Sequence, residues 1–244
     1  MRRVFALAAA LVLLGLGGAA QATVTIETVA VGDAGNLADT TGYGSVGYDY
    51  NIGKYEVTAG QYTEFLNAVA KSDPYELWEN RMPVPDLYGC MILRAGTSGN
   101  YSYTVAPEYA NRPVNWVSLW DACRFTNWLS NGQGTGDTET GTYTLNGYQG
   151  SDGRTIQRNT GWTWAVTSEE EWYKAAYYKG GGTSAGYWLY PTCSDNHPGA
   201  DMADVSGNNA NVAGLINSPG CLTEVGEFQN SDSPYGTFDQ GGNI

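Results

Sequence analysis

The stretch RPVNWVSLWDACRFTNWLS, residues 112–130, is the strongest indicator of the architecture because it encodes a helix that must be buried on most of its sides. Ser118 followed by Asp121 is typical of a capped helix start, and Gly132 is a typical helix end. Apolar side chains cover more than half of the circumference: Leu119, Trp120, Ala122, Cys123, Phe125, Trp128 and Leu129. Such a helix is expected to be nearly surrounded by protein.

Two further helices are predicted, one on each side of this stretch. Thr58 and Gln61 form a capping box before an apolar repeat of helical spacing. The other helix starts at Thr167 or Ser168, and the three glutamates that follow favour its N-terminus through the helix dipole. This helix is expected to turn Trp172 toward the core.

Strand patterns are short, and loop residues are abundant. Residues 23–31 alternate polar and apolar side chains, and residues 142–145 read as a strand closed by the turn signal Asn146–Gly147. The chain also has 33 glycines and 9 prolines among 244 residues, so irregular loops are expected to outweigh regular elements. The predicted class is α+β with little regular secondary structure.

Composition and charge exclude two classes of protein. A hydrophobic content of 42% excludes a disordered chain. The chain has 12 Lys and Arg against 25 Asp and Glu, a net charge of −13, and nucleic-acid binding needs clustered cations. We therefore predict an acidic globular protein with no nucleic-acid partner.

The N-terminus has the pattern of a secretory signal peptide. Arg2 and Arg3 precede an apolar run over residues 4–16, and residues 20–22 give a small-x-small cleavage site. The run is shorter than a membrane-spanning helix requires. We predict a signal peptide at 1–22 and one mature domain at 23–244, secreted or located in the periplasm or at the cell surface, with no membrane span after cleavage.

Export makes disulfides possible. Cys90, Cys123, Cys193 and Cys221 allow three pairings, and the sequence leaves open whether they form one or two bridges or remain buried thiols. Their spacing contains no CxxC, so a zinc site is not expected. The single histidine, His197, is predicted to be a surface loop residue rather than a catalytic one.

Four segments in this order resemble the formylglycine-generating enzyme, or sulfatase-modifying factor, family. They are IGKYEVTAGQYTEFLN (52–67), RPVNWVSLWDACRFTNWLS (112–130), WAVTSEEEWYKAAYY (164–178) and EVGEFQNSDSPYGTFDQGGN (224–243). The resemblance runs from about Tyr50 to the last residue. It implies an irregular α+β fold related to C-type lectins.

The resemblance also implies a chemistry. Active members oxidise a cysteine of a sulfatase to formylglycine, using oxygen and a copper ion held by two cysteines, which are soft ligands suited to Cu(I). Those cysteines follow the last segment in the family, whereas this sequence reads only to Ile244, and none of its four cysteines matches them. We expect copper only if such a C-terminal segment exists, and no catalytic residue can be assigned here.

Structural calcium is the second implication of the resemblance. One family site would correspond to the side chain of Asn211 and the backbone carbonyl of Val212, and another to Asn243. Amide and carbonyl oxygens suit a hard cation. The alternative is that these asparagines only shape turns.

Two functions therefore stay open. One is an exported, non-catalytic domain that uses a lectin-like scaffold to bind a protein or a glycan. The other is a fragment of an active copper-dependent oxidase of sulfatase cysteine. A fold resemblance does not choose between them, because function resides in the site.

Overall fold

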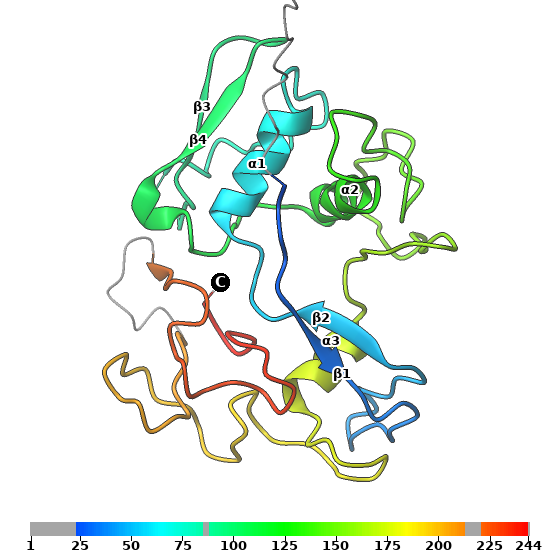
Figure 1. Ribbon diagram of the computed structural model, residues 1–244, viewed down its shortest axis with the longest axis vertical. Coiled ribbons are helices and arrows are strands. Elements are labelled where there is room, and N and C mark those ends of the chain that lie inside the picture. The colour runs from blue at the N-terminus through cyan, green and yellow to red at the C-terminus, as the bar shows by residue number, and fades with distance from the viewer. Residues whose placement is uncertain (1–22, 85–87, 213–220, 244) are drawn as a thin grey trace, which may run out of the picture.

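A computed structural model gives the structure of residues 23–84, 88–212 and 221–243. Within these ranges the helices and strands are short, and most residues lie in turns and loops that wrap around them (Figure 1). The elements are β1 (Thr28–Val31), β2 (Tyr50–Gly53), α1 (Ala59–Val69), β3 (Ile92–Ala95), β4 (Ser102–Val105), the 3-10 helix η2 (Pro107–Tyr109), α2 (Leu119–Ser130) and α3 (Glu169–Tyr177). This mixture of small helices and strands confirms the predicted α+β class.

The three α-helices of the described residues begin with the same device. In each, a Ser or Thr hydroxyl accepts a hydrogen bond from the backbone N–H three residues on, and the side chain at that position accepts one from the backbone N–H of the cap. The pairs are Thr58–Gln61 before α1, Ser118–Asp121 before α2 and Ser168–Glu171 before α3. The predicted helix starts are therefore confirmed.

The strands form two antiparallel pairs. β1 pairs with β2, with Thr28 opposite Gly53, and β3 pairs with β4, with Ile92 opposite Val105. A two-stranded pair is marginally stable alone. Each pair therefore depends on packing against its surroundings, and α1 packs against β4.

Two predicted strands differ from the structure. Only residues 28–31 of the predicted strand 23–31 pair as a strand, because the side chain of Gln133 binds the backbone of Val24 in place of a neighbouring strand. Residues 142–145 form a loop, since the Asn127 side chain satisfies the backbone N–H of Tyr143.

The turn predicted at the end of that loop is present. Asn146 and Gly147 have φ values of 52° and 76°. Positive φ at both central residues is the requirement of a type I′ turn. The local turn signal was therefore correct although the strand before it was not.

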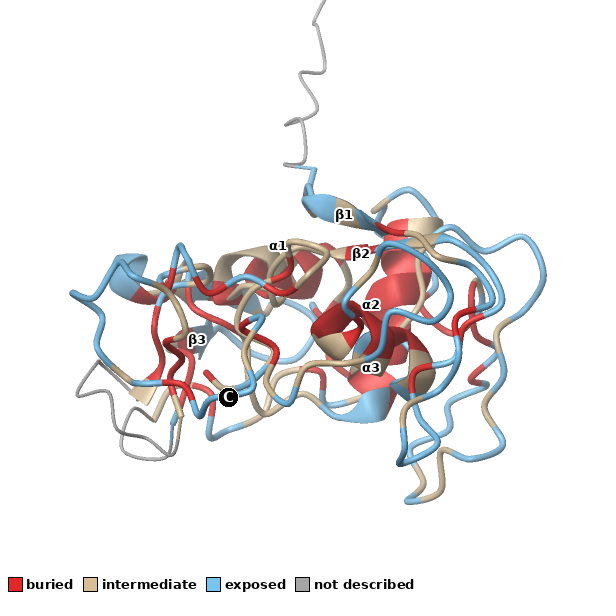
Figure 2. Ribbon diagram, turned by 90° about the horizontal axis from the view of Figure 1, so that it is seen from below, coloured by how far each residue is buried: buried red, intermediate tan, exposed pale blue. Residues whose placement is uncertain are grey.

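The largest apolar cluster lies between α1, α2 and the β3–β4 pair, where Figure 2 shows buried helix surface. Phe65 of α1 stands edge-on to Phe125 of α2 with ring centroids 5.4 Å apart, and 5.3 Å from Trp128. The buried apolar residues of α2 are Trp120, Cys123, Phe125, Trp128 and Leu129. The predicted burial of this helix is confirmed for these positions.

Two residues predicted to face the core are exposed. Leu119 is 45% exposed because it is the first residue of α2, where a side chain projects back over the preceding turn. Trp172 is 37% exposed, since α3 buries Lys174, Ala175 and Ala176 instead. Each expectation of an inward side chain was wrong.

None of the helices within the described ranges is both long enough and apolar enough to cross a membrane. The predicted signal peptide at residues 1–22 and the last residue, Ile244, lie outside the described residues.

Candidate functional site

Two residues predicted to bind calcium at separate sites lie side by side. The Nδ2 atom of Asn211 donates a hydrogen bond to Oδ1 of Asn243 over 3.1 Å, although 32 positions separate them in the chain. The backbone N–H of Asn243 donates to the carbonyl of Asn211 over 3.0 Å. Both side chains are at least 95% buried. We call this pair, together with Thr223, the asparagine node.

Local backbone features bring the two loops together. Gly199 and Asn209 form an isolated β-bridge just before Asn211. Gly242 precedes Asn243 and lies so close to Asn211 that an added Cβ would come within 2.2 Å of its carbonyl oxygen. Glycine is therefore required there for the close approach of the two backbones.

The side chain of Asn243 is fully used within the protein. Its Oδ1 also accepts hydrogen bonds from the backbone N–H of Thr223, over 2.7 Å, and from the Thr223 hydroxyl, over 2.8 Å. Its Nδ2 donates to Oε1 of Glu56 over 3.1 Å. The Asn243 side chain therefore links three chain segments. It hydrogen-bonds to neutral groups of Asn211 and Thr223 and to the carboxyl group of Glu56.

One polar atom of the Asn211 side chain has no hydrogen-bond partner among the described residues. Its Nδ2 donates to the carbonyl of Cys221 over 2.8 Å as well as to Asn243. Its Oδ1 is buried and has no hydrogen-bond partner among the described residues. A buried acceptor without a donor costs about 1–3 kcal/mol, so this oxygen is a candidate ligand-binding atom.

The same oxygen belongs to a residue that lines a cavity of about 640 Å³. We call this cavity the amide pocket. It is lined by Tyr88, Asn115, Trp116, Asn211, Val212, Cys221, Leu222, Gly241, Gly242 and Asn243. A second buried amide oxygen, Oδ1 of Asn115, is also without a partner in the described part of the chain. Two residues of the pocket lining therefore each carry a buried amide oxygen without a partner among the described residues.

Backbone strain gathers around this pocket. Four of its lining residues have left-handed backbone conformations without being glycine: Tyr88 (φ 58°), Trp116 (φ 59°), Cys221 (φ 59°) and Asn243 (φ 85°). Such a conformation is unusual for a bulky side chain and costs of the order of 1–3 kcal/mol. Strained residues concentrate at functional sites, so the strain supports a binding role for the pocket.

Trp116 is the largest side chain of the amide pocket. The guanidinium of Arg81 stacks on its ring, 3.8 Å from the centroid. Arg81 lines a different cavity, which Trp116 also borders. Trp116 therefore borders both cavities, and Arg81 lines only the other one.

The four cysteines are all thiols in the structure. Burial raises the pKa of Cys90 in the main apolar cluster and raises that of Cys123, in a second cluster, to about 11. Cys193 is exposed and contacts the carbonyl of Asp232, whereas Cys221 borders the amide pocket.

Copper(I) favours soft sulfur ligands, and a site built from two cysteines needs their sulfur atoms close together. The two buried thiols stay protonated at neutral pH and belong to different clusters. These residues therefore do not fit a copper centre, and the expectation that none of the four matches the family's copper ligands stays a prediction.

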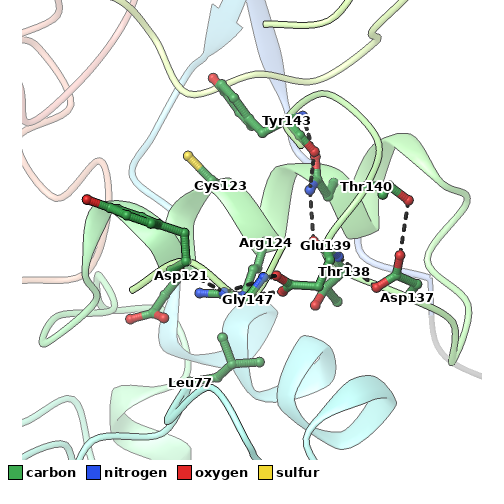
Figure 3. A network of polar contacts seen from close by, with 12 residues as sticks. Leu77, Asp121, Cys123, Arg124, Asp137, Thr138, Glu139, Thr140, Tyr143 and Gly147 are labelled. Carbon is green, nitrogen blue, oxygen red and sulfur yellow. Dashed lines mark hydrogen bonds and ion pairs between the residues drawn. The ribbon is translucent and has the colours of Figure 1, made fainter. Parts of the chain in front are cut away.

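A buried ion pair shapes the loop that follows α2 (Figure 3). Arg124, with no exposed side-chain area, donates from Nε to Oε1 of Glu139 over 2.6 Å. The other carboxylate oxygen accepts from the backbone N–H of Gly147 over 2.6 Å. No sequence pattern predicts this pair, because its partners are brought together only by the tertiary fold. We assign it a structural role.

Other titratable candidates do not gather into a metal site. Within the described residues, no group of three or more His, Cys, Asp and Glu side chains could hold a metal ion. His197 is exposed in its loop, with Nδ1 2.8 Å from the carbonyl of Pro198. Glu171 acts in the cap of α3. These positions agree with the structural roles predicted for them.

Comparison with known proteins gives a match at the level of the family. A family model described as Sulfatase-modifying factor enzyme 1-like domain, FGE-sulfatase, matches residues 22–244. No curated protein and no solved structure matches the chain.

Proposed function

Because the chain belongs to the family of sulfatase-modifying factor enzyme 1-like domains, we propose that it is an exported, non-catalytic member that binds a ligand in the amide pocket. The observation that carries this proposal is the convergence of two unpartnered amide oxygens on one strained pocket. The lectin-like architecture that the sequence resemblance implies is part of the proposal. Export is supported by the sequence pattern of residues 1–22.

The chemistry of the pocket favours a glycan. The amide oxygens of Asn115 and Asn211 accept hydrogen bonds, so the ligand must donate them. The Trp116 ring offers an apolar face in the same pocket. A sugar ring combines hydroxyl donors with a flat apolar face, and a cavity of about 640 Å³ falls within the usual range for ligand pockets.

The state of the thiols supports binding rather than oxidation. A cysteine reacts as its thiolate. Burial raises the pKa values of Cys90, Cys123 and Cys193, so these three side chains stay protonated at neutral pH. A protonated thiol is a weak nucleophile, and we derive no oxidative step for this chain.

Calcium is a structural part of the proposal. The unpartnered oxygen of Asn211 and the neighbouring Val212 carbonyl are of the kind that a hard cation prefers, and an ion bound there would take the Asn211 oxygen in place of a glycan hydroxyl. Asn243 has its oxygen occupied by three donors and would position Asn211 rather than bind the ion itself. Bound Ca²⁺ would stabilise the wall of the amide pocket by attracting the oxygen atoms of Asn211 and Val212.

A glycan array probed with the mature chain tests the binding proposal. We expect retention on at least one group of neutral glycans, and a loss of at least tenfold with Asn115→Ala or Trp116→Ala. Trp162→Ala is the matched control, because Trp162 is 40% exposed and lies outside the amide pocket.

Two outcomes would overturn the proposal. One is that the folded wild-type chain binds no glycan on the array. The other is that Trp116→Ala and Trp162→Ala reduce retention equally, which would place the binding surface elsewhere. Circular dichroism of each variant separates a lost contact from a lost fold.

A further inference from the structure

A second cavity lies on the other side of the asparagine node. It has a volume of about 450 Å³, and Gly242 borders both it and the amide pocket. Its walls are mainly apolar and include Phe125, Leu129, Trp164, Val166 and Phe238. The charged residues that line it are Glu56 and Asp239. We call this cavity the acid groove.

The two carboxyls of the acid groove are incompletely satisfied. Asp239 accepts a hydrogen bond from the backbone N–H of Gly226 over 2.6 Å, and Glu56 accepts one from Asn243 through Oε1. Oε2 of Glu56 is buried with no partner in the described ranges, and so is Oε1 of Gln240, which lines the same groove. When Glu56 is protonated the two carboxyls also hydrogen-bond to each other, so the groove is short of donors only once both are ionised.

The protein provides no counter-ion for this pair among its described residues. The six ion pairs found there include neither Glu56 nor Asp239. Lys54 is the neighbouring cation in sequence, but its Nζ is 2.9 Å from Glu27. Burial, followed by repulsion from Asp239, raises the pKa of Glu56 to about 9, and burial also raises the pKa of Asp239.

We propose that the acid groove binds a small organic cation, an amidinium, guanidinium or ammonium group carried on an apolar body. The charged group would donate hydrogen bonds to Glu56, Asp239 and Gln240, which are the acceptors of the groove. The apolar body would lie against the aromatic and aliphatic walls. A charge-assisted hydrogen bond is stronger than a neutral one, and the aromatic rings favour a cation further.

The rings at one end of the groove already receive a cation. Nζ of Lys54 lies 5.1 Å from the ring centroid of Tyr55 and 5.9 Å from that of Phe238. These two rings are 5.4 Å apart, and both residues line the groove. A neutral apolar ligand would leave the proton between Glu56 and Asp239 in place, whereas a cation can replace that proton and also lie against the rings.

Benzamidine is the probe that tests this inference, with neutral benzamide as its isostere. By calorimetry on the mature wild-type chain at pH 8, we expect benzamidine to bind at least tenfold more tightly than benzamide. Glu56→Gln and Asp239→Asn should each reduce benzamidine affinity at least tenfold. Glu108→Gln, which changes an exposed acid outside the groove, should leave the affinity within twofold.

The affinity should also rise between pH 6 and pH 9. Glu56 and Asp239 face the ligand, Glu227 acts on Asp239, and cation binding is stronger once the groove carboxyls are ionised. The proton carried by Glu56 must dissociate when the cation binds. Equal binding of benzamide and benzamidine, or unchanged affinity in both Glu56→Gln and Asp239→Asn, would overturn the proposal.

The outcome is separable from that of the glycan proposal. Trp116→Ala alters the amide pocket and not the acid groove, so this variant should keep wild-type benzamidine affinity. Glu56→Gln keeps an oxygen for the Asn243 side chain to donate to. A normal thermal midpoint for this variant would show that any lost binding is not lost folding.

Discussion

Replacing Glu171 by Gln tests how α3 is held against the rest of the protein. Glu171 is 3% exposed. Its Oε1 accepts hydrogen bonds from Arg158, over 2.7 Å, and from the Tyr48 hydroxyl, over 2.6 Å. Its Oε2 accepts from Arg158, over 2.6 Å, and from the backbone N–H of Ser168, over 2.7 Å. One carboxylate therefore joins the helix cap to two other segments.

The size of the effect follows from the pKa of this carboxyl. Burial alone would raise it, but the hydrogen bonds from Arg158, Tyr48 and Ser168 lower it from 4.5 to about 2. At 1.36 kcal/mol per pKa unit, the ionised form contributes about 3 kcal/mol to the free energy of unfolding at pH 7. Because the folded pKa is depressed, this contribution is complete above about pH 5 and is lost as the pH falls toward 2.

Urea unfolding of the wild type and of Glu171→Gln, measured from pH 7 down to pH 2, is the assay. We expect the variant to be less stable by about 3 kcal/mol at pH 7, with the difference shrinking toward zero at pH 2. Glu169→Gln is the matched control, since Glu169 is exposed in the same helical turn. A difference that stays constant with pH, or that Glu169→Gln reproduces, would show that the Glu171 carboxylate does not stabilise the fold through its ionised form.

Three further predictions concern other parts of the fold. Thr58→Ala removes the cap of α1 and should lower the free energy of unfolding by about 1 kcal/mol in urea. Glu56 has a pKa of about 9 in the folded protein, so the thermal midpoint of the wild type should fall as the pH rises from 4.5 to 9. The thermal midpoint of Glu56→Gln should not show this fall. Asn211→Asp places a carboxylate beside Asn243 Oδ1, where bound Ca²⁺ would neutralise it. The thermal midpoint of this variant should therefore drop in a chelator and recover with added Ca²⁺. No recovery, or equal recovery in Asn211→Ala, would contradict the calcium proposal.

The helix starts could be predicted from the sequence because they depend on residues three positions apart. The caps Thr58, Ser118 and Ser168 each work within one helical turn. The burial of α2 was predictable for a similar reason, since its apolar face is continuous. Local signals of this kind need no knowledge of the partner surface.

Strand patterns were less informative because a strand needs a partner. Residues 142–145 have the composition of a strand, but the side chain of Asn127 takes their hydrogen bonds. Trp172 also depended on context: its apolar character predicted burial, and smaller residues of α3 occupy the inner face. In both cases tertiary contacts overrode the local pattern.

Only part of the lining of the amide pocket could be named from the sequence, and its arrangement could not. Asn211, Val212 and Asn243 were identified through the family resemblance, and the structure places all three around one pocket. Asn115 and Trp116 were not identified as binding residues, because an unpartnered amide and a left-handed tryptophan have no sequence signature. Their roles come from the fold.

The central claim is that the amide pocket binds a hydroxyl-bearing ligand through Asn115, Asn211 and Trp116. The most direct test is a ¹⁵N NMR titration of the mature chain with the glycan retained most strongly on the array. If the glycan binds in the amide pocket, the side-chain amide signals of Asn115 and Asn211 and the indole N–H signal of Trp116 shift together. The indole signal of Trp162 does not shift. Saturable shifts confined to other residues, with these three signals unmoved, would contradict it.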